Sequence, residues 1–157
     1  MKIIDVTSED GEPPDWCPDL AIAAARTLKE VGITEYEVGI LLCSDSRIAE
    51  LNATYRGKDQ ATDVLSFSQD EGESIPSSES TGLRGDIAIS LDSVQANASR
   101  FKVSASEESV RVAVHGVLHL AGFEHNGVTL SDSASGEHEM LGLQEKIVNA
   151  ITKEQEE

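Results

Sequence analysis

The segment from Ser104 to His125 limits the fold more than any other stretch of this sequence. Ser104 and Glu107 have the spacing of a capping box, which indicates that a helix begins there. Apolar residues then recur on one side of that helix, namely Val110, Val114, Val117, Leu118 and Ala121. Gly122 follows where the helix must end, because glycine adopts left-handed backbone geometry without steric cost. We therefore predict a helix over about 104–121 whose apolar stripe packs into the core.

The rest of the chain alternates between predicted strands and predicted helices, with no internal repeat. Segments rich in β-branched and apolar residues predict strands near residues 2–6, 35–43, 62–67 and 85–91. Helical spacing predicts further helices near residues 20–31, 45–57, 92–101 and 134–153. The polar segment over 69–84 is rich in serine, with two glycines and a proline, so we expect an exposed loop there.

Length, charge and cysteine content exclude several classes of protein. The 157 residues suit one domain, 1–157, with a core of its own. No stretch approaches the ~18 consecutive apolar residues of a membrane span, and the acidic N-terminus does not resemble a secretion signal, so we expect a cytoplasmic protein without a membrane partner. Cys17 and Cys43 lack CxxC spacing and are expected to be small core residues. The formal net charge of −17 repels a polyanion at long range.

Three of the four histidines lie in the eleven residues HGVLHLAGFEH, at 115–125. His115 and His119 are one helical turn apart and point from one face of the predicted helix. Two such histidines are often no more than partly buried polar residues. With Gly122 and His125, however, the spacing H-x3-H-x2-G-x2-H matches that of the metzincin ligand helix. Three imidazoles with an open fourth position are typical of a catalytic zinc site, so we predict one zinc ion per chain.

Gly116 separates this segment from the zinc peptidases that share its spacing. Those enzymes have a glutamate directly after the first histidine, where it is the general base for the zinc-bound water. A glycine cannot accept a proton, so a peptidase mechanism would lose its base here while the metal ligands remain. The segment is therefore zincin-like in the spacing of its ligands but not in its chemistry.

The same segment resembles the HGxLHLxGxDH signature of the YbeY family of bacterial endoribonucleases. A second segment, LNATYRGKDQATDVLSFSQDE at 51–71, is similar to the other hallmark of the family, LNxxYRGKDxPTDVLSF. The two motifs occur in the order of the family, with GDIAIS between them and EMLGLQEKI after them. The resemblance therefore extends over most of the chain.

The resemblance implies a single-domain α+β fold, in which a four-stranded mixed sheet packs with helices and a central zincin-like helix carries metal ligands. It implies that His115, His119 and His125 hold one zinc ion and that Arg56, in the YRG segment, is functionally essential. Members of the family are single-strand-specific endoribonucleases that mature the 3′ end of 16S ribosomal RNA and act in quality control of the small ribosomal subunit. Ribosomal RNA and the small subunit are therefore the expected partners.

The chain departs from the family pattern at three points. Ala61 replaces the proline that usually precedes TDVLSF, which loosens the backbone but removes no chemical group. Phe123 and Glu124 replace a Tyr-Asp pair, so a hydroxyl is lost and the carboxylate lies on a longer arm. The acidic net charge is the third departure. Docking through a small-subunit ribosomal protein or a ribosome-maturation GTPase would bring such an acidic protein to RNA.

The predicted site residues suit phosphodiester hydrolysis. Zinc bound by three histidines lowers the pKa of a bound water toward ~7 and polarises a phosphoryl oxygen. Arg56 is the candidate catalytic residue, because a guanidinium can bind a phosphate in bidentate geometry, whereas an arginine that caps a helix end is the alternative. Lys58 and Arg84 are candidates for contacts with the RNA backbone, although each also fits an ordinary solvated surface charge. Tyr55 and Phe67 could stack on bases, but their periodic positions predict core residues.

Two other functions compete with a ribonuclease. A ribosome-assembly factor with a mainly structural metal would bind the small subunit without turnover. A zinc peptidase-like hydrolase would need another general base in place of the missing glutamate.

His138 is expected to be an exposed helical histidine and not a fourth ligand. Because imidazole also binds other divalent metals, the prediction of zinc depends on the ligand spacing.

Overall fold

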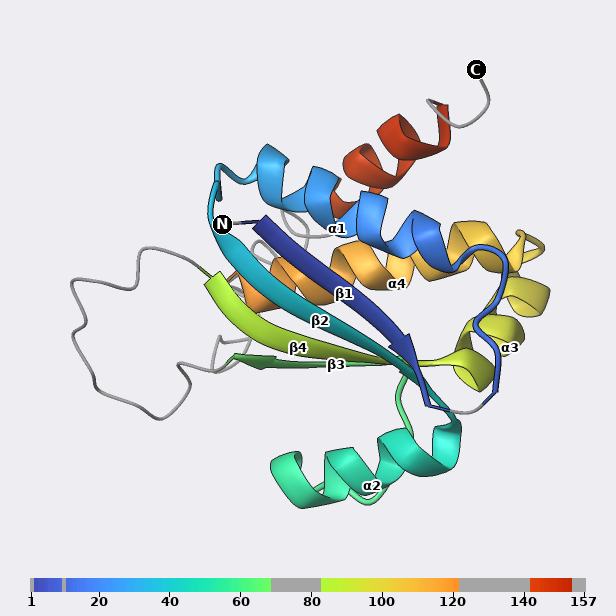
Figure 1. Ribbon diagram of the computed structural model, residues 1–157. Coiled ribbons are helices and arrows are strands. Elements are labelled where there is room, and N and C mark those ends of the chain that lie inside the picture. The colour runs from blue at the N-terminus through green and yellow to red at the C-terminus, as the bar shows by residue number, and fades with distance from the viewer. Residues whose placement is uncertain (1, 10, 69–82, 122–141, 154–157) are drawn as a thin grey trace, which may run out of the picture.

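The computed structural model describes residues 2–9, 11–68, 83–121 and 142–153 (Figure 1). These residues build a mixed sheet with the strand order β1-β2-β4-β3. The strands β1 (Lys2–Ser8), β2 (Tyr36–Cys43) and β4 (Leu83–Ser90) are parallel, and β3 (Val64–Ser68) is antiparallel to β4. The predicted α+β fold with a four-stranded mixed sheet is therefore confirmed for these parts of the chain.

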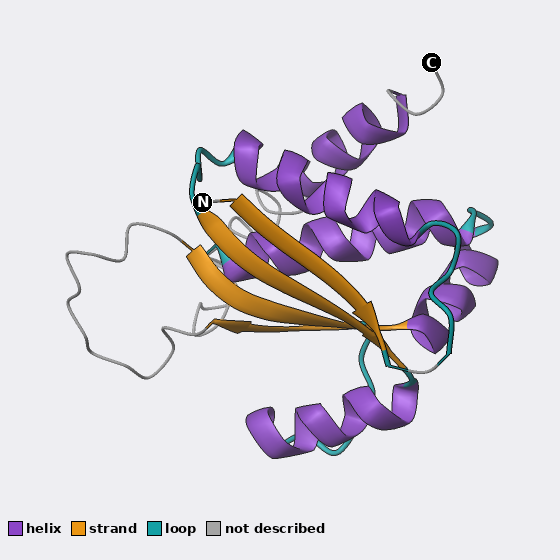
Figure 2. Ribbon diagram, viewed as in Figure 1, coloured by secondary structure: helices purple, strands orange, loops and turns teal. Residues whose placement is uncertain are grey.

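Helices cover the two faces of this sheet unequally. They are α1 (Cys17–Glu30), α2 (Asp45–Arg56), α3 (Leu91–Phe101), α4 (Ala105–Leu120) and a final helical segment over 142–153. The helices α1 and α4 and the final segment lie on one side of the sheet, and α2 lies on the other side (Figure 1, Figure 2). One face of the sheet is thus covered, and α2 covers the other face only in part.

Serine residues cap three of the helices. Ser44, Ser90 and Ser104 precede α2, α3 and α4, and each side chain accepts a hydrogen bond from the backbone N–H three residues later. The helix start predicted at Ser104 is therefore confirmed. Gly57 ends α2 in the left-handed conformation, with φ of 71°, and the chain turns there from Arg56 toward β3.

Alternation along the strands separates a large core from a small one. On β2, Val38, Ile40 and Leu42 point toward α1 and α4 and are at most 1% exposed. Leu41 and Cys43 point the opposite way and join the smaller cluster around Ile48 of α2. The large core therefore lies between the sheet and the pair α1 and α4, which holds α4 firmly against the strands.

One side-chain prediction is wrong. Tyr55 is 65% exposed and not part of the core, because burial falls along α2 from Ile48 through half-buried Leu51 to Tyr55 as the helix leaves the sheet. Cys17 is half-buried at the start of α1, with Pro18 in the first turn, and packs against the large core. Cys43 is buried as predicted.

Several predicted features lie outside the described residues. They are residues 69–82 of the loop predicted over 69–84, Gly122, Phe123, Glu124, His125, His138 and the beginning of the helix predicted over 134–153. The last two residues of that predicted loop, Leu83 and Arg84, instead begin β4. In the part of the chain that the structure does describe, no helix combines the length and the apolar character that crossing a membrane requires.

Candidate active site

The helix α4 carries the two described histidines of the predicted metal site. Its apolar residues, among them Val114 and Val117, are buried against α1 and the sheet, and this leaves His115 and His119 one turn apart on another face. Their Nε2 atoms are 3.1 Å apart, and their rings meet edge to face with centroids separated by 4.6 Å. The sequence thus correctly placed these two imidazoles side by side.

At Gly116, α4 packs closely against the sheet. A Cβ atom built on this glycine would lie 3.0 Å from methyl groups of both Val64 and Ile87. Ser66 of β3 also donates a hydrogen bond to the carbonyl of Gly116, at 2.8 Å. A longer side chain at this position would point into the sheet and not toward the histidines. Gly116 occupies the position of the general base of zinc peptidases, and close packing against the sheet also requires a glycine there.

Gln144, on the final helical segment, contacts the first histidine. The side chain is 6% exposed, and its Oε1 atom lies 2.6 Å from Nδ1 of His115. Its Nε2 atom donates to the carboxylate of Glu145 at 3.0 Å. A histidine that binds a metal usually donates its other ring N–H to an oxygen of this kind.

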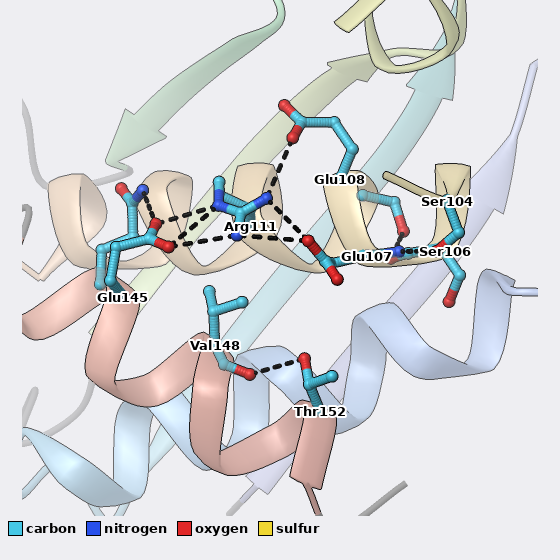
Figure 3. Close-up of polar contacts among 10 residues, drawn as sticks. Ser104, Ser106, Glu107, Glu108, Arg111, Glu145, Val148 and Thr152 are labelled. Carbon is cyan, nitrogen blue, oxygen red and sulfur yellow. Dashed lines mark hydrogen bonds and ion pairs between the residues drawn. The ribbon is translucent and has the colours of Figure 1, made fainter. Parts of the chain in front are cut away.

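Arg111 connects α4 to the final segment (Figure 3). Its Nε and Nη2 atoms donate to the two carboxylate oxygens of Glu145 at 2.9 and 3.1 Å, and its guanidinium also contacts Glu107 and Glu108. Burial acts to raise the pKa of Glu145, but hydrogen bonds from Arg111 and Gln144 outweigh it and lower that pKa. Burial raises the pKa of Glu108, although Arg111 opposes this effect. Glu145 is therefore an ionised acceptor beside Gln144.

Arg56 is the last residue of α2 and is held close to β3. Its Nη2 atom donates a hydrogen bond to the backbone carbonyl of Ser66, and its guanidinium carbon lies 5.7 Å from the centroid of the Phe67 ring. The ring of Tyr55 meets Phe67 edge to face, with centroids 5.3 Å apart. Contacts with Ser66 of β3 and with Phe67 thus fix the direction of this arginine.

A pocket of about 420 Å³ brings most of the predicted site residues together. It is lined by Arg56, Lys58, His115 and His119, together with Asn52, Gln60, Thr62, Asp63, Val64, Leu65 and Ser66. The side chain of Asn52 donates to the carbonyl of Gln60 at 2.9 Å, which ties α2 to the segment that follows it. The two histidines, the candidate catalytic arginine and Lys58 therefore share one cavity between α2, β3 and α4.

Arg84 lies elsewhere. It projects from β4 on the partly covered face of the sheet and forms an exposed ion pair with Glu37, with Nε and Oε2 separated by 3.8 Å. That face also carries a groove of about 710 Å³, whose lining includes Asp5, Phe67 and Asp86. Arg56 lines both the groove and the histidine pocket. The structure thus brings Arg56 and Lys58 to the histidines but does not bring Arg84 there.

Comparisons with known proteins give the family. The model of the family described as endoribonuclease YbeY matches residues 16–152. The chain belongs to the endoribonuclease YbeY family. Proteins named endoribonuclease YbeY from Treponema pallidum (strain Nichols) and Treponema denticola are 41% and 39% identical, over 92% and 90% of this chain and 87% and 88% of the relatives. The solution structure of TM1509 from Thermotoga maritima has a TM-score of 0.61 and 28% identity, and it covers 98% of this chain and 92% of that one.

YbeY proteins are hydrolases of phosphodiester bonds and are generally metal-dependent, and the described histidines fit a metal ion. Two imidazole nitrogens on a tetrahedral zinc ion are about 3.3 Å apart, given bonds of about 2.0–2.1 Å. The Nε2 atoms of His115 and His119 are 3.1 Å apart. Within the described ranges, no three His, Cys, Asp or Glu side chains are grouped for a metal, and His125 lies outside those ranges. The separation of these two nitrogens is therefore compatible with binding to one metal ion.

The sequence reasoning missed two residues of this YbeY site. Ser66, on β3, holds both the carbonyl of Gly116 and, through its own carbonyl, the guanidinium of Arg56. Gln144 holds His115. One signal could have indicated Gln144: it is a polar residue one turn before Ile147 and Val148, which are buried in the core. A polar side chain on the apolar face of a helix usually has a hydrogen-bond partner, and here the partner is a predicted ligand.

Proposed function

We propose that this protein is a zinc-dependent, single-strand-specific endoribonuclease that matures the 3′ end of 16S ribosomal RNA and acts in quality control of the small ribosomal subunit in the cytoplasm. One observation carries the proposal. The facing Nε2 atoms of His115 and His119, 3.1 Å apart, open into the same pocket as Arg56 and Lys58. Membership of the YbeY family supports it from an independent direction.

In this proposal, His115, His119 and His125 hold one zinc ion. The ion, when bound, supplies a Lewis acid for a phosphoryl oxygen and a water of lowered pKa. The protein supplies the rigid placement of the imidazoles, because α4 is packed against the sheet at Gly116 and His115 is held by Gln144. The absence of a carboxylate at residue 116 fits phosphodiester hydrolysis better than peptide hydrolysis.

Arg56 has the role of binding the scissile phosphate and stabilising the charge that develops on it. A guanidinium presents planar paired N–H groups that match two phosphate oxygens, and its charge persists at every physiological pH. The carbonyl of Ser66 and the ring of Phe67 fix its direction before substrate binds. Lys58, in the same pocket, adds positive charge for the neighbouring backbone, and Arg84 would contact RNA farther away, along the groove.

The net charge of −17 shapes how the protein meets its substrate. Long-range repulsion slows the encounter with bare RNA, whereas the local cations Arg56 and Lys58 favour binding once the strand is close. We therefore propose that a small-subunit ribosomal protein or a ribosome-maturation GTPase recruits the protein, and that the small subunit is its working partner.

The test is cleavage of precursor small-subunit RNA by the purified protein, free or on ribosomal particles, with the metal content measured in the same preparation. We expect one zinc per chain and a cleavage rate that falls about 10²- to 10³-fold in Arg56→Ala, the usual loss when one transition-state donor is removed. Arg56→Lys should restore little, because lysine cannot bind phosphate in bidentate geometry. Arg100→Ala, an exposed arginine on α3 outside the linings of the pocket and the groove, is the matched control and should stay within about threefold of the wild type.

Two outcomes would assign a different function. A zinc-loaded protein that binds the small subunit without cleaving RNA, and whose His119→Ala variant supports growth with only a lower melting temperature, would be an assembly factor with a structural metal. Chelator-sensitive cleavage of casein, with no cleavage of RNA, would make it a peptidase.

A further inference from the structure

Gln144 is a buried polar side chain with contacts on both sides, and the two contacts determine which way its amide points. An ionised carboxylate has no hydrogen to donate, so Glu145 acts only as an acceptor, and its Oε2 atom lies 3.0 Å from Nε2 of Gln144. The amide nitrogen must therefore face Glu145. The amide oxygen is left to face Nδ1 of His115, at 2.6 Å.

The orientation of the amide in turn selects the protonation pattern of the imidazole. An amide oxygen has no hydrogen to donate, so the 2.6 Å contact requires a hydrogen on Nδ1 of His115. A neutral imidazole carries one N–H, and its Nε2 atom then has a lone pair. That Nε2 atom is the one that faces His119 across 3.1 Å, in the pocket that also contains Arg56.

Arg111 keeps Glu145 in place and ionised. It donates to both carboxylate oxygens of Glu145, and its own position is fixed by Glu107 and Glu108 on α4 (Figure 3). The pKa of Glu145 is lowered, since hydrogen bonds from Arg111 and Gln144 outweigh the effect of burial. From Arg111 to His115, every hydrogen bond therefore has a defined donor and a defined acceptor.

We propose that Gln144 and Glu145 are positioning residues that hold His115 in the Nδ1–H form, so that its Nε2 lone pair is available to a metal ion before the ion arrives. The proposal rests on the proposed function in one respect, which is that His115 is a ligand. It assigns to the final helical segment a role in the site, although that segment supplies no side chain to the lining of the histidine pocket.

The first test compares Gln144→Met with the wild type. Methionine is of similar length but is only a weak acceptor, so it removes the oxygen that selects the tautomer. Long-range proton–nitrogen NMR spectra of the metal-free protein, recorded where imidazole is neutral, report which nitrogen of His115 carries the hydrogen. We expect Nδ1–H in the wild type, and in Gln144→Met a mixture in which Nε2–H is prominent. Zinc affinity, measured by competition with a chelator, should fall about 10- to 100-fold.

Two variants that each remove one carboxylate partner of Arg111 distinguish a positioning role from an effect on overall stability. Glu145→Gln and Glu107→Gln each remove one carboxylate partner of Arg111, but only Glu145 touches Gln144. We expect Glu145→Gln to weaken zinc binding several-fold and to mix the His115 tautomers. Glu107→Gln should leave both measurements unchanged, whatever its effect on the melting temperature.

An exchange of the two side chains provides the rescue. In the double variant Gln144→Glu with Glu145→Gln, the carboxylate at 144 accepts from His115, the amide at 145 donates to it, and the amide oxygen accepts from Arg111. The net charge is unchanged. We expect the Nδ1–H signal to return and the zinc affinity to recover to within about threefold of the wild type.

The outcomes that overturn this inference differ from those that overturn the proposed function. A wild-type protein that binds zinc through His115, but whose tautomer and affinity are unaffected in Gln144→Met and Glu145→Gln, would eliminate the positioning role alone. Equal losses of affinity in Glu107→Gln and Glu145→Gln would also eliminate it, because both would then reflect general stability. A wild-type protein that shows the Nδ1–H tautomer and binds no metal would instead contradict the zinc-dependent function.

Discussion

The two faces of the sheet differ in what covers them and in the charge they carry. The face toward α1 and α4 is apolar and closed, with Ile40 and Ile87 at most 1% exposed. The opposite face is only partly covered by α2 and has a groove of about 710 Å³ whose lining includes Asp5, Asp86 and Arg56. The closed face positions α4 and its histidines, whereas the open face leaves room for a strand of substrate or for another molecule.

This difference explains how two segments sixty residues apart form one site. The packing of α4 in the closed core positions the two histidines and therefore sets the distance between their Nε2 atoms. Arg56 comes from α2 on the open side and reaches the histidine pocket past β3, where Ser66 and Phe67 hold it. The edge strand β3 lies between the closed and the open side. Substitutions on the two faces of the sheet should therefore change the free energy of unfolding by unequal amounts.

The largest effect is expected at Gly116. Replacement by glutamate would restore the sequence pattern of a zinc peptidase, but the new side chain would enter the contact with Val64 and Ile87, where even a Cβ atom lies 3.0 Å from methyl groups. Burying a carboxylate there while forcing α4 away from the sheet should cost more than about 4 kcal/mol of unfolding free energy. Circular dichroism during urea unfolding measures this loss.

Gly142→Glu is the matched control for that substitution. Gly142 is also helical, but it is exposed, and no atom lies within 4 Å of a Cβ built there. We expect no loss of stability, and a gain of about 0.5–1 kcal/mol from the better helix propensity of glutamate. If the two variants lost equal stability, close packing at Gly116 would not be the reason for its glycine.

The second prediction compares adjacent residues of β2 that point to opposite faces. Ile40 is buried in the large core, so Ile40→Ala should cost about 2–5 kcal/mol. Leu41 is half-buried on the groove side, and Leu41→Ala should cost less than about 1 kcal/mol. Urea unfolding measures both losses from the shift of the midpoint, provided that the slope of the unfolding free energy against urea concentration is unchanged. A Leu41→Ala loss as large as that of Ile40→Ala would mean that the groove side is packed as tightly as the core.

The sequence predicted well wherever the signal is local. The capping box at Ser104, the end of α2 near residue 57 and the apolar strand near 35–43 each depend on residues within one turn or one strand. Tyr55 was misplaced because periodicity gives the face of a helix on which a residue lies, but not how far that helix stays in contact with the sheet.

The site was predictable to the extent that its residues lie in short motifs. His115 and His119 share one helix, so spacing was enough to predict that they lie together. Arg56 and Lys58 lie in one segment, but their assignment to the same site came from the resemblance to the family. Gln144 could not be nominated in the same way, because its contact with His115 joins residues 29 positions apart and depends on how the final segment packs against α4. Arg84 has the right charge for RNA but projects from the open face toward Glu37.

The smallest predicted effect concerns the charge on the open face. The carboxylate of Asp86 lies against Gly39, since a Cβ built on that glycine would be 2.5 Å from Oδ1 of Asp86. Burial of the carboxylate, and then the charge of Glu37, raise the pKa of Asp86 above its ordinary value of 3.8. A raised carboxyl pKa means that the folded state loses stability as the pH rises from 3.8 through the folded-state pKa.

Asp86→Asn should therefore stabilise the protein at pH 7 and have no such effect well below pH 3.8, where the carboxyl group is neutral in both states. Because the residue is exposed, solvent screens the penalty, and the gain should stay below about 0.5 kcal/mol, or a rise of about 1–2 °C in Tm. Paired thermal melts at neutral and acidic pH measure the difference. The same gain at both values of pH would point to a change in packing on Gly39, and a loss at pH 7 would show that the open face needs this negative charge for its own stability.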